Sequence, residues 1–150
     1  MTTSLIATTL NLEIRERITL KGVSHGSKTV HNISGITEVF QRIMEVPTAG
    51  TEILQFATKG AGAFSTGMKY MRITNKDSAN FITLTFYDHL TASSANDLFA
   101  VKLEAGKSFL LGSTSFDASV SDADGLLTAD QTIVEVTAKA DTDAVDIEIF

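Results

Sequence analysis

Residues 70–86, YMRITNKDSANFITLTF, decide how this chain folds. Polar residues that favour turns occupy positions 75–80, and residues of high β propensity flank them on both sides. After the turn, Ile82, Leu84 and Phe86 would point to one face of a strand, and the residues between them to the other. Alternation with period two around a polar turn is typical of an antiparallel hairpin, which we predict here.

Two further segments repeat this pattern. Residues 99–111, FAVKLEAGKSFLL, alternate around a hinge at Ala105-Gly106, and residues 132–150 alternate around a tight turn at 140–143. Both segments are therefore predicted to be hairpins. The predicted core takes inward positions of all three segments: Leu84, Phe86, Val101, Leu103, Phe109, Val136 and Ile147.

The N-terminal third also favours strands. Four aliphatic residues share one parity, and Glu16 interrupts the set. A turn is expected at residues 24–27, followed by a strand. Residues 36–46 fit either a helical stripe or a strand, and the strands on both sides favour a strand. The four aliphatic residues are Leu12, Ile14, Ile18 and Leu20.

The whole pattern predicts an all-β fold. About eight or nine short strands, with turns at regular spacing, are typical of an antiparallel β-sandwich or a small barrel. Among these we predict a jelly-roll-like sandwich. The sequence is divided into a flexible N-terminal arm, residues 1–11, and a single β-sandwich domain, residues 12–150.

Composition excludes several classes of function. The 150 residues include no cysteine, so no disulfide and no cysteine-based zinc site is expected. No apolar run approaches the about 20 residues that a membrane-spanning helix needs. The formal net charge is −6 and the cations are dispersed, which argues against binding to nucleic acid.

Motifs for catalysis, cofactors and metals are not found. His25, His31 and His89 lie far apart, without a metal-binding spacing. The run Asp122-Ala123-Asp124-Gly125 resembles part of a calcium loop, but the other ligand positions of that loop do not match. The acidic residues at 141–148 are interpreted as a solvated turn and strand face. We therefore expect no catalytic, cofactor-binding or metal-binding residue, and no enzyme activity.

Three stretches together resemble small β-sandwich virion proteins of tailed bacteriophages. They are the strand and Asn-x-Asp turn at residues 70–77, the Leu-x-Ala-Gly hinge within 99–109, and the Ala-Asp-Thr hairpin at 138–145. The resemblance covers about residues 15–150, and its motifs are structural turns. It implies a structural part of the virion without enzyme activity, and it transfers no functional residue to this chain.

The leading hypothesis from the sequence is a capsid decoration or cement protein, located on the virion. It would bind the major capsid protein or another virion protein and form a homo-oligomer, with a trimer favoured. The predicted partner-binding residues are the three aliphatic residues of the arm, Leu5, Ile6 and Leu10. The alternatives are a tail or neck component of the virion, and a carbohydrate-binding jelly roll. The absence of tryptophan argues against the latter, because sugars usually stack on such rings.

Overall fold

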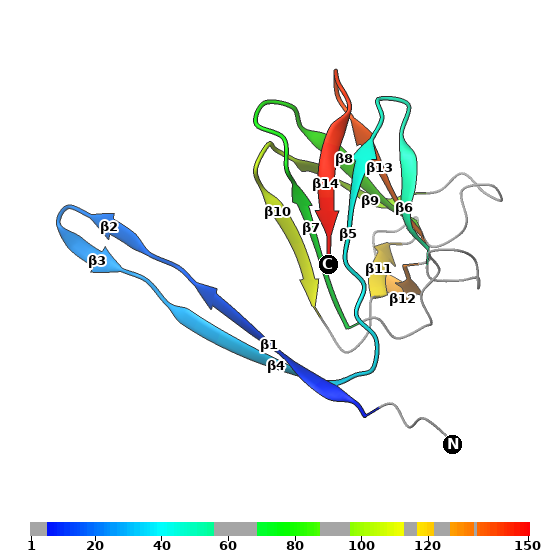
Figure 1. Cartoon of the computed structure of the whole chain (residues 1–150). Helices are drawn as coiled ribbons and strands as arrows, with labels where there is room; N and C mark the ends of the chain where they lie inside the picture. Colours follow the sequence, from blue (N-terminus) through cyan, green and yellow to red (C-terminus); the bar gives the residue numbers. More distant parts are fainter. Residues whose placement is uncertain (1–5, 56–68, 88–96, 113–116, 122–126, 134) are drawn as a thin grey trace. The chain divides into compact units, whose positions relative to one another are not determined.

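The computed structural model describes the chain except for residues 1–5, 56–68, 88–96, 113–116, 122–126 and 134 (Figure 1). Every helix or strand in the described part is a β-strand. No described segment is a helix long and apolar enough to cross a membrane. The chain forms two compact units, Met1–Val39 and Phe40–Phe150, and each is described by itself.

The first unit is a two-stranded antiparallel ribbon. Strand β1 pairs with β4, and β2 pairs with β3 in the same register. The N–H of Glu16 donates to the carbonyl of Ser27 at 2.9 Å, which joins the two ladders into one. The strands of this ribbon are β1 (Thr8–Arg15), β2 (Ile18–Leu20), β3 (Val23–His25) and β4 (Lys28–Ile36).

The tip of the ribbon is a two-residue turn. Lys21 and Gly22 both have positive φ angles, 50° and 79°, as the type I′ turn of tight hairpins requires. The turn expected at residues 24–27 is therefore wrong, because Ser24 and His25 continue β3. Residues 8–11, which were expected to lie in a flexible arm, are paired with β4.

The second unit is a sandwich of two four-stranded antiparallel sheets, drawn one behind the other in Figure 1. One sheet has the order β10-β7-β14-β5 and the other β6-β13-β8-β9. If these eight strands are numbered 1 to 8 in chain order, the order in the first sheet is 6-3-8-1 and the order in the second sheet is 2-7-4-5. This is the strand order of a jelly roll, so the predicted fold is confirmed. The strands are β5 (Arg42–Val46), β6 (Thr51–Gln55), β7 (Tyr70–Asn75), β8 (Ile82–Tyr87), β9 (Asp97–Leu103), β10 (Ser108–Gly112), β13 (Glu135–Ala140) and β14 (Val145–Ile149), and a separate pair is formed by β11 (Asp117–Ser121) and β12 (Leu127–Thr132).

None of the three predicted hairpins is a hairpin. Strands β7 and β8 lie in different sheets, as do β9 and β10, and β13 and β14. Each connection has four or more residues and carries the chain across the about 10 Å between the sheets. The alternation in sequence is the same in both arrangements, because it reports which face is buried and not which strand is the neighbour.

Both sheets contribute to one core. The inward set on β8 is Ile82, Leu84 and Phe86, as predicted, and the ring of Phe86 stacks on that of Phe99 at 4.4 Å. Of the predicted core, five residues are buried, whereas Val101 and Phe109 are half-buried and pack against it. The buried five are Leu84, Phe86, Leu103, Val136 and Ile147.

Candidate interaction surfaces

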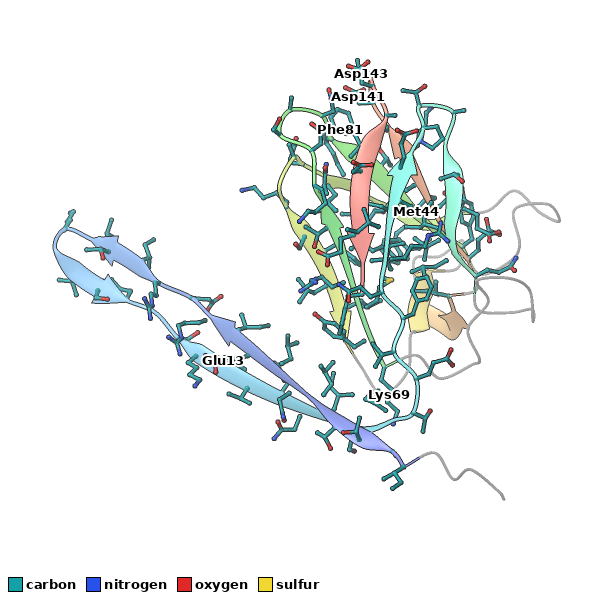
Figure 2. The ribbon with its side chains drawn as sticks, in the orientation of Figure 1. Glu13, Met44, Lys69, Phe81, Asp141 and Asp143 are labelled. Carbon is teal, nitrogen blue, oxygen red and sulfur yellow. The ribbon has the colours of Figure 1, made fainter. Side chains whose placement is uncertain are left out.

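The ribbon has two faces of opposite character. Because its register is continuous, even-numbered residues of β1 and β2 share a face with odd-numbered residues of β3 and β4. We call this the apolar face and the other the charged face; side chains project from both sides of the ribbon in Figure 2. The apolar face carries Leu10, Leu12, Ile14, Ile18, Leu20, Val23 and Ile33, and the charged face carries Glu13, Arg15, Arg17 and Lys28 together with one exposed aliphatic residue, Val30.

The apolar face is open to solvent, most of all near the tip. Ile18, Leu20 and Val23 are 62%, 59% and 57% exposed. An isolated two-stranded ribbon is at best marginally stable in water. Side chains of this kind gain about 1.5–3 kcal/mol each on full burial, so covering the face would stabilise the ribbon strongly.

A polar contact divides the apolar face in the middle. The hydroxyl of Ser27 donates to the carboxylate of Glu16 at 2.5 Å. Beside this contact, a Cβ at Gly26 would lie 2.3 Å from the carbonyl oxygen of Glu16, so the close approach of the two strands requires glycine. His25 and His31 also lie on the apolar face, opposite Ile18 and Leu12.

The charged face is linked by ion pairs. The carboxylate of Glu13 lies 2.8 Å from Arg15 and 2.9 Å from Lys28. All three side chains are about half-exposed, so these pairs add little to stability. Neither Arg17 nor Lys21 forms an ion pair with any residue in the part of the chain that the structure describes.

The three predicted partner-binding residues were expected in one flexible arm, but the structure places them in different surroundings. Leu5 lies outside the described residues, and Ile6 precedes β1 and is 88% exposed. Leu10 lies in β1, half-buried, opposite Ile33. Sequence reasoning missed Val23 and Ile33, whose place on the apolar face follows only from the two-residue turn at the tip.

The three turns that carried the resemblance meet at one end of the sandwich, where Phe81, Asp141 and Asp143 are labelled in Figure 2. The buried amide of Asn75 organises this end. It donates to the carbonyls of Asn80 at 2.9 Å and Leu103 at 3.2 Å, and accepts from the N–H of Asp77 at 2.9 Å. The hydroxyl of Thr142 then donates to the side-chain oxygen of Asn80 at 2.9 Å. These contacts hold the loops at this end of the sandwich together.

Asp77 makes the same turn sensitive to acid. Its Oδ1 accepts the N–H groups of Asn80 at 2.7 Å and Ala79 at 2.6 Å, and these bonds, that of Asn80 first, hold the pKa of the carboxyl below its usual value. A lowered pKa adds stability that is fully present above the unfolded pKa, about 3.9, and is lost as the pH falls through the folded pKa.

We therefore expect Asp77→Asn to be less stable than wild type at pH 7. The difference should shrink steadily below about pH 4, because the wild-type carboxyl becomes neutral as well. Urea denaturation at pH 7 and pH 3 measures both quantities. A difference that is the same at the two pH values would show that the charge of Asp77 plays no part.

The outer face of the β10-β7-β14-β5 sheet combines aromatic, apolar and acidic groups. The guanidinium of Arg72 lies 5.5 Å from the ring centroid of Phe150 and 3.7 Å from the carboxylate of Glu148. The ring of Tyr70 meets that of Phe150 edge-on at 6.0 Å, and burial raises the pKa of this tyrosine, an effect that Arg72 partly offsets. Gln41 donates to Glu148 at 2.9 Å.

Exposed residues surround this cluster. Ile43 on β5 is 67% exposed and lies opposite Glu148. Glu45 and Asp146 are directly opposite each other on β5 and β14, both exposed, and neither has an ion pair within the described residues. Like charges at such positions repel. This outer face therefore joins apolar contact area to unpaired negative charge.

The outer face of the other sheet has a different composition. Thr83, Thr85 and Thr137 alternate with the buried residues of β8 and β13, and Lys102 and Lys139 flank them. The ammonium of Lys102 lies 4.0 Å from the ring centroid of Phe81. This face is polar and carries charges of both signs, because Glu52 lies opposite Thr137. Among the described residues it has no exposed large aliphatic side chain, so the two outer faces would attract different partners.

One pair of carboxylates lies where strands β6 and β13 pair. Glu135 is buried, and burial together with the charge of Glu135 raises the pKa of Glu52. Within the described residues, however, no group of three or more histidine, aspartate or glutamate side chains could hold a metal ion. His89 and the run at 122–125, both considered in the sequence, lie outside those residues.

Comparison with known proteins adds no relative to this description. No protein-family model matches the chain, and a search of curated proteins finds no match.

Proposed function

We propose that this protein is a structural component of a tailed-bacteriophage virion, most specifically a capsid decoration or cement protein. The observation that carries this proposal is a jelly roll joined to a ribbon whose apolar face is exposed. Exposed apolar area of this kind is typical of surfaces that bind other proteins. The resemblance of its three turns to those of virion β-sandwich proteins supports the same conclusion. These turns meet at one end of the sandwich.

In this role the protein stabilises the shell through protein–protein contacts. Its partners are the major capsid protein or another virion protein, and further copies of itself, with a trimer as the favoured assembly. A standard interface buries about 1,600 Å² in total, and many copies act together, so modest contacts per copy are sufficient. Leu5, Ile6 and Leu10 are the proposed anchors on the particle, and each adds up to about 1.5–3 kcal/mol when buried.

The experiment is a binding and heating assay with purified virions. Particles without the protein should open at a lower temperature than complete particles, and adding the purified protein should restore the opening temperature. A variant with Ile6→Ser and Leu10→Ser should co-sediment poorly with particles while its own sandwich melts as in wild type. Thr9→Ser, at a neighbouring exposed position, is the matched control and should bind normally.

Electron microscopy of antibody-labelled particles then separates capsid from tail. Label on the shell agrees with the proposal, whereas label confined to the tail or neck would favour the alternative virion role. If the protein is absent from purified virions by mass spectrometry, the proposed function is wrong.

A further inference from the structure

The ribbon is longer than the sheets of the sandwich. Thr8 to Leu20 form one continuous edge, which spans roughly 40 Å at the usual rise per residue. The sandwich strands have five to seven residues and therefore span about 17–23 Å. The ribbon is therefore longer than either sheet, and its tip, residues 18–23, is exposed.

Charge indicates which molecule that is. Residues 1–39 contain four cations and three anions, whereas residues 40–150 contain eight cations and fifteen anions. The two units of one chain thus carry opposite net charges. A second copy of this chain offers an acidic sandwich to each positively charged ribbon tip.

The composition of the two outer faces indicates where the contact forms. The β10-β7-β14-β5 sheet has exposed Ile43 and Leu110 on its two edge strands, and the unpaired carboxylates of Glu45 and Asp146 lie next to Ile43 on β5 and β14. The other outer face is rich in threonine, and its Lys102 and Lys139 are accompanied by the carboxylates of Glu52 and Glu135, so it has neither an excess of negative charge nor an exposed aliphatic residue among those described. Only the first face matches both the apolar residues and the cations of the ribbon.

We infer that the ribbon of one copy packs its apolar face against the outer face of the β10-β7-β14-β5 sheet in a second copy. Ile18, Leu20 and Val23 cover Ile43 and Leu110, which are exposed in the single chain. The long side chains of Arg17 and Lys21 reach around the edges of the ribbon to Glu45 and Asp146. The inference deepens the homo-oligomer of the proposed function and does not depend on where the protein resides.

Such a contact joins two different surfaces, so each copy gives its ribbon to one neighbour and receives a ribbon from another. Head-to-tail contacts of this type close into a ring when the rotation between copies permits it. The trimer favoured in the proposed function is one such closed ring.

The test is the oligomeric state in solution, measured by sedimentation velocity on the full chain without particles. Wild type should be an oligomer. Leu20→Asp in the ribbon and Ile43→Asp in the sheet should each weaken self-association at least tenfold. Ala100→Asp, at an exposed position on the other outer face, is the matched control and should associate as wild type does.

Charge reversal tests the pairing itself. Arg17→Glu with Lys21→Glu should dissociate the oligomer, and so should Glu45→Lys with Asp146→Lys. The four changes together should restore association. Circular dichroism and melting temperature check that each variant remains folded.

A zero-length carbodiimide cross-link provides the second measurement. In an equal mixture of ¹⁴N- and ¹⁵N-labelled protein, we expect mixed-isotope links from Lys21 to Glu45 or Asp146. Links within one isotope only would show that the ribbon folds back on its own chain and would overturn the inference. Association that survives Ile43→Asp but not Leu20→Asp would show that ribbons pair with each other, which also overturns it.

The outcome is separable from that for the proposed function. A monomer that still binds virions would disprove this interface and leave the cement function intact. An oligomer that gives the expected cross-links but is absent from virions would support this interface and disprove the cement function.

Discussion

A chain that ends at Asp143 should be insoluble when expressed. It lacks β14, which lies between β7 and β5 and pairs with both. The side chains of Val145, Ile147 and Ile149 are at most 1% exposed, and losing each costs about 1.5–3 kcal/mol of burial alone. Together they approach the whole stability of a typical domain, about 5–15 kcal/mol, and β5 is also left without a neighbour.

The solubility of the truncated chain and its far-UV circular dichroism measure this result. A single change in the same strand provides a graded comparison: Ile147→Ala should lower the free energy of unfolding by about 2–5 kcal/mol. Lys139→Ala, at an exposed position on β13, should change it by less than about 0.5 kcal/mol. A soluble truncated protein with a normal β spectrum would show that β14 is not required for the sandwich.

Replacing Asn75 with leucine should destabilise the sandwich by about 2–4 kcal/mol in urea denaturation. Leucine has the same number of side-chain heavy atoms, branched at the same carbon, but cannot replace the three hydrogen bonds that the amide makes with Asp77, Asn80 and Leu103. Each buried backbone group without a partner costs about 1–3 kcal/mol, and water can reach the part-buried ones. A loss below about 0.5 kcal/mol would show that the turns hold together without this amide.

Asn75→Asp should make the free energy of unfolding depend on pH, and the direction of this dependence can be worked out. The new carboxylate would be buried and would face two carbonyl oxygens, so its folded pKa should rise above the unfolded value of about 3.9. Relative to wild type, the variant should therefore be most stable at low pH, where the new carboxyl group is neutral, and should lose stability as the pH rises through the folded pKa. Asn11→Asp, which is exposed in the ribbon, is the control and should show no such slope. A difference in stability from wild type that shifts in favour of Asn75→Asp as the pH rises would contradict this account.

The burial pattern of the sandwich could be predicted from sequence, but its connections could not. Ile82, Leu84 and Phe86 alternate with polar residues whether the next strand lies beside β8 or in the opposite sheet. Choosing between these requires the distance that a turn spans, which a turn of ordinary composition does not specify. The strands and turns were therefore predicted at the right residues, but the pairing of the strands was wrong.

Contacts between segments that are distant in the chain could not be predicted from the sequence either. The parity of Leu12 to Leu20 identified half of the apolar face, but the other half depends on the register that the turn at Lys21 and Gly22 imposes. The role of Asn75 was hidden for a related reason. One of its partners, Leu103, is far away in the chain, and an asparagine in a turn usually bonds only to nearby backbone.

The two units should also differ in how fast they form. Every contact along the ribbon is local, since its strands are joined by the turn at Lys21 and Gly22, and such hairpins close in about 1–10 μs. The sandwich has to bring Val46 beside Val145 before its second sheet is complete, and pairings so distant in sequence make folding slow. During synthesis the ribbon therefore emerges first and exposes its apolar face before the sheet that we infer to be its partner has formed, so newly made chains pass through a stage in which this face is uncovered.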